Sequence, residues 1–109
     1  MAYDEALADR VRSIVGARGA VTERKMFGGV TWMVHGNMAC GVLGEDIAVR
    51  LSHEDAERAL AERHTRPFTM TGRRARGFVI VAGEALTSDE ELSRWVDAGA
   101  DHASSLPAK

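Results

Sequence analysis

Residues 26–51 read MFGGVTWMVHGNMACGVLGEDIAVRL, and this stretch holds three short apolar runs separated by glycine-containing pairs. Gly36-Asn37 and Gly44-Glu45 have the composition of tight hairpin loops, because glycine readily adopts the positive φ angles of such turns. The runs beside them are rich in β-branched and large apolar residues, as strands usually are. The stretch therefore predicts a compact antiparallel meander with strands at residues 30–35, 38–43 and 46–51, preceded by a lead-in at 23–27.

Helices are predicted on both sides of this meander. Ser52 and Ser88 have side chains suited to capping a helix N-terminus, and each is followed by an acidic residue in the first turn. One helix is therefore expected to begin at Ser52, and another is expected at residues 88–102, with a loose tail from about residue 104. A first helix is expected at residues 3–18, where apolar residues recur at helical spacing: Leu7, Val11, Ile14 and Val15.

Length and composition set the class of the protein. The chain has 109 residues, enough for one domain with a modest core, and the predicted elements give an α+β domain with a central antiparallel sheet of about five strands and three helices. The net charge of -2 gives no general attraction to nucleic acid, and no apolar run is long enough to span a bilayer. Cys40 is the single cysteine and the start is acidic, unlike a signal peptide. We therefore expect a cytoplasmic protein without membrane contact.

Each two-residue loop fixes which strand residues lie opposite one another, and opposed residues share a face of the sheet. A loop at Gly36-Asn37 places Met33 opposite Cys40, and a loop at Gly44-Glu45 places Cys40 opposite Val49. One face then collects the residues that the helices are expected to cover: Met33, Met38, Cys40, Val42, Ile47, Val49 and Leu51. The other face carries Val30, Trp32, Val34, Ala39, Gly41, Leu43, Ala48 and Arg50.

This second face is more apolar than contact with solvent requires. Uncovered apolar patches usually mark interaction sites, so the face around Trp32 is predicted to form a homodimer contact or a shallow ligand groove. Trp32 is expected across from Gly41, whose missing side chain leaves room for the indole. The alternative is that one of the helices crosses over the sheet and covers this face. The residues proposed for the contact are Val30, Trp32, Val34, Leu43 and Arg50.

Residues 63–83 contain no acidic residue, and five arginines occupy the first part of this segment: Arg63, Arg66, Arg73, Arg74 and Arg76. The segment is predicted to form a weak strand at 68–71, a basic turn at 72–77 and a strong strand at 78–81. Its guanidinium groups are suited to hold phosphates or an acidic partner. The interpretation that we favour is a solvated edge whose arginines prevent aggregation between sheets, because nucleic-acid binders are usually basic overall and carry interleaved aromatic residues.

Signatures of catalysis and metal binding are weak. His35 and Cys40 lie diagonally on the predicted hairpin, but apolar neighbours flank Cys40, which is the setting of an inert buried thiol. Four scattered histidines and one cysteine match no established spacing of metal ligands. Ser52 and Ser88 are explained by helix capping, and Gly28-Gly29 lacks the context of a phosphate-binding loop. No catalytic residue, cofactor or metal is therefore expected.

Five motifs stand out in combination: RKMFGGV at residues 24–30, WMVHGNM at 32–38, VRLS at 49–52, RPFTMTG at 66–72 and RGFV at 76–79. Together they resemble the N-terminal domain of the TfoX/Sxy family, and the resemblance covers residues 3–103. It implies an α+β fold like that of secretion chaperones, in the order α-β-β-β-α-β-β-α. It also implies a bacterial regulatory role, since named members of the family activate competence genes together with a cyclic-AMP-responsive activator.

The resemblance supplies no catalytic residues, and the named members carry a second, C-terminal helical domain that this sequence does not show. We therefore expect a non-enzymatic regulatory or protein-binding module, with a homodimer as the preferred assembly and an unidentified protein as a further partner. The first alternative is a nucleic-acid-associated accessory factor that uses the arginine segment. The second is a small enzyme that uses His35 and Cys40.

Overall fold

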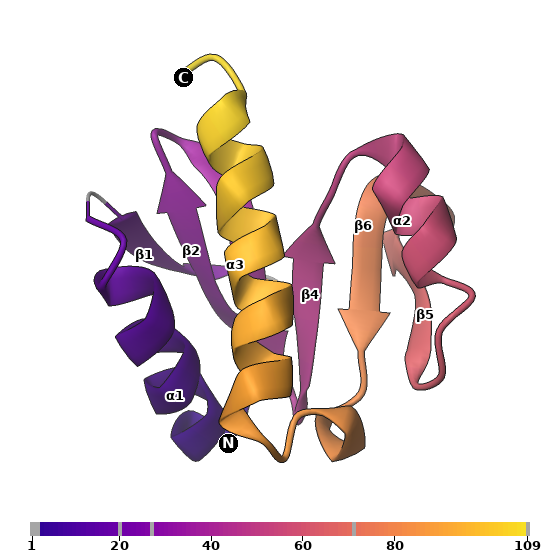
Figure 1. Cartoon of the computed structure of the whole chain (residues 1–109), viewed down its shortest axis with the longest axis horizontal. Coiled ribbons are helices and arrows are strands. Elements are labelled where there is room, and N and C mark those ends of the chain that lie inside the picture. The colour runs from indigo at the N-terminus through magenta and orange to yellow at the C-terminus, as the bar shows by residue number, and fades with distance from the viewer. Residues whose placement is uncertain (1–2, 20, 27, 71, 109) are drawn as a thin grey trace.

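The computed structural model describes residues 3–19, 21–26, 28–70 and 72–108 (Figure 1). Within these ranges the elements are, in chain order, α1 (Glu5–Gly16), β1 (Val21–Met26), β2 (Gly29–Val34), β3 (Asn37–Leu43), β4 (Asp46–Arg50), α2 (His53–Ala59), β5 (Thr65–Met70), β6 (Arg73–Val81), the 3-10 turn η1 (Gly83–Ala85) and α3 (Asp89–Ser105). The predicted α+β class with three helices and an antiparallel sheet is confirmed. The sheet has six strands rather than about five, because β1 pairs along its whole length with β2.

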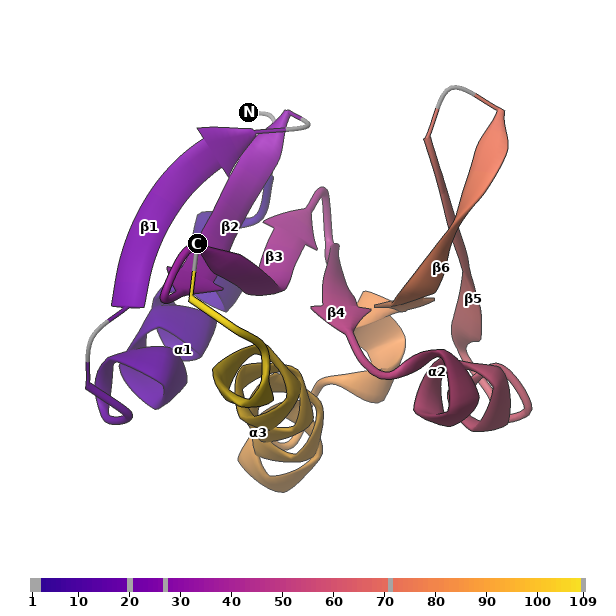
Figure 2. The same cartoon turned by 90° about the horizontal axis from the view of Figure 1, so that it is seen from above.

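The strands of the sheet are antiparallel and follow the order β1-β2-β3-β4-β6-β5. The helices of the described chain lie on one side of it, with α3 along β3 and β4 and α1 beside α3 (Figure 1). Figure 2 shows the two ends of the sheet, β1–β2 and β5–β6, curling away from the helices. Within the described residues, one face of the sheet is therefore covered by helices, and the opposite face is not.

Side-chain caps fix where the helices begin. The Oδ1 atom of Asp4 accepts a hydrogen bond of 3.1 Å from the Leu7 amide at the start of α1. The hydroxyl of Ser52 accepts one of 3.0 Å from an amide in α2, and that of Ser88 accepts one of 3.1 Å from an amide in α3. Each cap satisfies an amide that has no partner within its helix, so the capping predicted for the two serines is confirmed.

The C-terminal helix extends beyond its predicted end at residue 102. It continues through Ser105, and the following Pro107 accepts a hydrogen bond of 2.9 Å from the side-chain amide of Asn37. Asn37 is buried, so this bond satisfies a polar group that would otherwise be costly to bury. The segment expected to be loose from about residue 104 is thus attached to the hairpin of β2 and β3.

The hairpin between β2 and β3 turns one residue earlier than predicted. Its loop is His35-Gly36 instead of Gly36-Asn37, and both loop residues have positive φ angles, 51° for His35 and 83° for Gly36. Two consecutive positive φ angles define the type I′ turn, whose twist matches that of the paired strands. The register of the next hairpin is confirmed, since Cys40 lies opposite Val49.

A β-bulge at Ala39 shifts the pairing a second time. Met33 lies opposite Met38, whereas Trp32 lies opposite Cys40, so Ala39 has no partner on β2. Trp32 and Cys40 therefore share a face, although the predicted register placed them on opposite faces. The prediction that Met33 and Met38 lie on the covered face with Cys40 is wrong, because a one-residue slip moves a side chain to the other face of the sheet.

The covered face packs against α1 and α3 in one large apolar cluster. Helix α3 approaches the sheet closely at Gly99, where an added Cβ atom would overlap the carbonyl oxygen of Ala39 and lie 3.1 Å from a methyl group of Val49. The bulge therefore lies directly beneath the glycine. Fully buried side chains on this side of the sheet include Val11, Val30, Trp32, Ile47, Leu86 and Leu92.

We expect Gly99→Ala to destabilise the fold by about 1–3 kcal/mol, because the new methyl group forces α3 away from the sheet. The matched control is Gly16→Ala, also in a helix, where an added Cβ meets nothing within 4 Å and the usual gain of up to about 1 kcal/mol is expected. Urea unfolding of both variants measures the difference. Equal effects of the two substitutions would contradict the close approach of α3.

Candidate protein-binding face

The residues predicted to form an uncovered face around Trp32 do not lie together. Val30, Trp32 and Val34 are only 0%, 1% and 6% exposed, and they lie on the side of the sheet that the helices cover. Leu43 and Arg50 lie on the opposite side. The prediction for Val30, Trp32 and Val34 is wrong, because the bulge moves the β2 side chains to the other face of the sheet. The earlier turn shifts the pairing by two residues and leaves the faces unchanged.

Trp32 is held in place by a polar network at the edge of the covered side. Its indole Nε1 atom donates a hydrogen bond of 2.9 Å to Glu23 of β1, and the Nε atom of Arg12 in α1 donates one of 2.7 Å to the same carboxylate. The guanidinium carbon of Arg12 lies 6.0 Å from the centre of the Trp32 ring. Hydrogen bonding from Arg12, opposed by burial, lowers the pKa of Glu23 below its ordinary value of 4.5.

The uncovered side of the sheet carries a separate apolar cluster, which we call the open face. All of its described members belong to strands, and none belongs to a helix. Four are buried and four are partly exposed: Met38, Ala48, Phe68 and Ile80, and then Met33, Leu43, Ala75 and Phe78. The sheet thus has a second apolar surface, which is covered by no helix in the described ranges.

Small residues form the middle of the open face. Thr31 and Ala48 are fully buried there, and the Thr31 hydroxyl donates a hydrogen bond of 3.1 Å to the Arg24 carbonyl. Gly41 belongs to β3, between the strands of Thr31 and Ala48. A Cβ atom added to it would lie only 2.9 Å from the Thr31 methyl group. The middle of the open face is therefore formed by small residues that are closed to solvent.

An aromatic pair and an arginine lie on the β6 side of the open face. The rings of Phe68 and Phe78 meet edge to face, with centroids 5.8 Å apart and an angle of 68° between their planes. The guanidinium carbon of Arg50 lies 5.6 Å from the centroid of the Phe78 ring, within the range of a cation–π contact. These contacts fix the orientation of the partly exposed Phe78.

The charged groups around the open face are mostly cations. Arg24 lines a pocket of about 280 Å³ with Met33, and Arg73 points to the same side as Ala75 because strand residues two apart share a face. Arg24, Arg50 and Arg73 form no ion pair within the part of the chain that the structure describes. We call these three residues the arginine rim.

The predicted arginine segment is differently arranged. Its supposed turn at residues 72–77 is largely strand β6, and its weak strand at 68–71 belongs to β5, which begins at Thr65. Residue 71 lies outside the described residues. Arg66 pairs with Asp46 at 2.8 Å, and Arg74 pairs with Glu57 of α2, so their charges are compensated. Within the arginine segment, the exposed arginines without an ion pair among the described residues are Arg63, Arg73 and Arg76.

Acidic side chains gather on the helical side instead. Arg10 pairs with Asp89 at 3.1 Å, Arg18 reaches Asp97 and Asp101, and Arg94 pairs with Glu62 at 2.8 Å. These pairs connect α1 and the α2–β5 segment to α3. The molecule therefore has an acidic, internally paired helical layer and a cationic open face.

Cys40 and His35 are not brought together as a reactive pair. Cys40 is completely buried opposite Trp32, whereas His35 is exposed in the hairpin loop. Burial raises the pKa of the Cys40 thiol to about 12, so the thiol stays protonated at neutral pH. Among the described residues, no group of three or more histidine, cysteine or acidic side chains is arranged to hold a metal ion.

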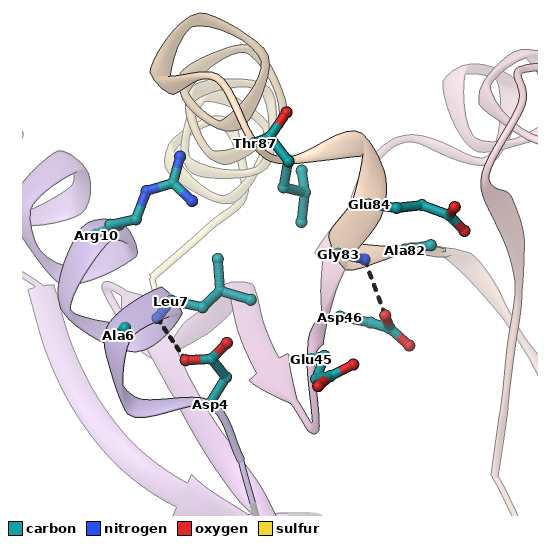
Figure 3. Close-up of a pocket in the computed structure, with 11 residues that line it drawn as sticks. Asp4, Ala6, Leu7, Arg10, Glu45, Asp46, Ala82, Gly83, Glu84 and Thr87 are labelled. Carbon is teal, nitrogen blue, oxygen red and sulfur yellow. Dashed lines mark hydrogen bonds between the residues drawn. The ribbon is translucent and has the colours of Figure 1, made fainter.

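A larger pocket of about 500 Å³ lies between the start of α1, the β3–β4 turn and η1 (Figure 3). Several of its polar groups already have structural partners. Asp4 caps α1, and Asp46 accepts a hydrogen bond of 3.0 Å from the Gly83 amide while it also pairs with Arg66. No sequence motif marks this pocket, because its walls come from three segments that are distant in the chain.

In the described residues, no helix combines the length and the apolar composition that crossing a bilayer requires.

The fold and the open face define a small α+β domain whose helical layer covers one side of a six-stranded sheet. The chain belongs to the TfoX N-terminal domain family, whose family model matches residues 13–103. The match begins within α1 and ends within α3, so it includes every strand of the described sheet. The resemblance noted in the sequence is thereby confirmed. No curated protein matches this chain.

We expect Glu23→Gln to reduce stability at pH 7 and to flatten the loss of stability in acid. The folded-state pKa of Glu23 is depressed, so its contribution is complete above pH 4.5 and is lost as the pH falls through the folded pKa. Urea unfolding at pH 7 and at several values below pH 4.5 measures both effects. Glu45→Gln, in an exposed loop, is the control, and identical acid profiles for the two variants would contradict the network.

We expect Cys40 to resist alkylation in the folded protein, because its thiol is buried and protonated. Iodoacetamide labelling followed by mass spectrometry should show little modification without denaturant and complete modification in urea. Rapid labelling of the folded chain would contradict this account and revive the hypothesis of a reactive cysteine.

Proposed function

We propose that this chain is a non-enzymatic regulatory module that binds another protein through the open face. The observation that carries the proposal is a contiguous apolar cluster on the side of the sheet without a helical cover, bordered by the arginine rim. Uncovered apolar surface with a polar border is typical of protein interaction sites. Membership of the family supports a bacterial, cytoplasmic regulatory role like that of competence regulators.

The side chains that could act in catalysis have structural roles instead, which supports a binding function. The hydroxyls of Ser52 and Ser88 cap helices, and the Cys40 thiol is held protonated in the core. The carboxylate of Glu23 is occupied by Arg12 and by the Trp32 indole. Each of these groups lies on the helical side of the sheet or at a helix end, away from the open face.

The contacts that the aromatic rings already make favour a protein partner over a nucleic acid. Single-stranded nucleic acids stack on free aromatic faces beside a basic groove. Here the rings of Phe68 and Phe78 already contact each other edge to face, and the guanidinium of Arg50 contacts the Phe78 ring. Arg66 and Arg74 are also neutralised by carboxylates.

Photo-crosslinking tests the proposal. A photoreactive amino acid in place of Met33, on the open face, should trap a discrete protein in native cells, and mass spectrometry identifies that protein. The control carries the same amino acid in place of Glu90, which is exposed on α3. A second substitution, Leu43→Ser, should remove the crosslink from Met33. Equal trapping at Glu90, or crosslinks to nucleic acid alone, would contradict the proposal.

A further inference from the structure

We propose that the partner presents an acidic amphipathic helix to the open face, with its apolar stripe on the sheet and its carboxylates at the arginine rim. This inference rests on the proposed function and specifies the chemistry of the partner. It depends on three observations, namely the paired backbone of the inner strands, the cations that lack internal partners, and the way α3 covers the other side of the same sheet.

The backbone of the open face favours a helix over a strand as its occupant. Strands β2, β3, β4 and β6 each pair with a neighbour on both sides, so their amides and carbonyls are used within the sheet. A segment that lies on this face finds side chains there and must satisfy its own backbone groups. An α-helix does so internally, whereas an added strand needs the edge of a sheet.

The charge of the rim favours carboxylates on that helix. Asp46 lies opposite Leu43 at the start of β4, and Arg66 already neutralises its carboxylate at 2.8 Å. Arg24, Arg50 and Arg73 have no ion pair among the described residues, so a cationic partner would be repelled. The cations border the apolar cluster, and carboxylates that flank an apolar stripe would meet them.

The covered side of the sheet shows that such an arrangement fits this fold. Helix α3 packs an apolar stripe on β3 and β4, and its Asp97 and Asp101 reach Arg18, which follows the end of α1. An acidic amphipathic helix on the open face would repeat this combination on the other side of the same two strands. The partly exposed Met33 and Leu43 offer it side chains that adapt to different shapes.

A second copy of the chain is a poorer occupant. Two open faces that meet around a twofold axis bring the arginine rims of both copies into one interface, because a symmetric contact uses the same patch twice. Six guanidinium groups would then lie near one another, with Asp46 of each copy already paired. The homodimer predicted from the sequence is therefore treated as an outcome of the test.

The test uses a fluorescently labelled peptide of about 18 residues that forms a helix with a leucine stripe flanked by glutamates. Fluorescence anisotropy with the full chain at about 0.1 M salt should show saturable binding. Three controls use a scrambled peptide without a stripe, a version with lysine in place of glutamate, and an oligothymidylate of about 20 nucleotides. All three should bind at least about tenfold more weakly. The lysine peptide is repelled by the arginine rim, whereas the scrambled peptide and the oligothymidylate lack the apolar stripe.

Matched variants locate the binding site. Arg24→Glu with Arg73→Glu should weaken binding of the acidic peptide by about tenfold or more. Lys25→Glu with Arg63→Glu makes the same change in net charge at exposed residues outside the arginine rim and should have little effect. Circular dichroism confirms that both variants fold. Equal weakening by the two pairs, or equal binding of the acidic and lysine peptides, would overturn the inference.

The remaining outcomes distinguish the acidic helix from the other possible occupants of the open face. Tighter binding of the oligothymidylate than of the acidic peptide would overturn the inference in favour of nucleic acid. Sedimentation that shows a dimer broken by Leu43→Ser would assign the face to a second copy. If crosslinking from Met33 identifies a protein partner but the acidic peptide fails to bind, the inference falls and the proposed function stands. If crosslinking fails as well, both fall.

Discussion

The bulge at Ala39 is the constraint on which the arrangement of this domain depends. It adds one residue to β3, so that Trp32 and Cys40 face the helices while Met33 and Met38 face away. Its carbonyl lies beneath Gly99, where the absence of a side chain lets α3 approach the sheet. Without the bulge, the largest side chain of the sheet would leave the core and enter the open face.

The two sides of the sheet differ in charge as well as in packing. Carboxylates of the helical layer are mostly paired with arginines of the same layer, and the pairs connect α1 to α3. The arginine rim has no such partners among the described residues, although the whole chain carries a net charge of -2. A negative protein can therefore present a cationic face, which overall composition does not reveal. Such local fields govern which partners approach a surface.

Local signals in the sequence were sufficient for much of the fold. Ser52 and Ser88 were predictable as caps because capping involves only neighbouring residues, and Gly44 fixed the β3–β4 register. The β2–β3 register was not predictable, since His35-Gly36 and Gly36-Asn37 are both plausible loops and no local signal marks the bulge at Ala39, which lies against the distant α3. The predicted binding face depended on this register, so its β2 residues were assigned to the wrong side of the sheet. Leu43 and Arg50, which belong to β3 and β4, were assigned to the correct side.

The central claim is that the helices cover one side of the sheet and leave the other for a partner. Nuclear Overhauser effects between assigned side chains measure this directly. We predict contacts between the Trp32 indole and the Arg12 side chain, and between the Met38 methyl group and Gly41, with none from Met33 or Met38 to α1 or α3. Contacts from the methionine methyl groups to either helix, with a solvent-exposed Trp32, would contradict the account.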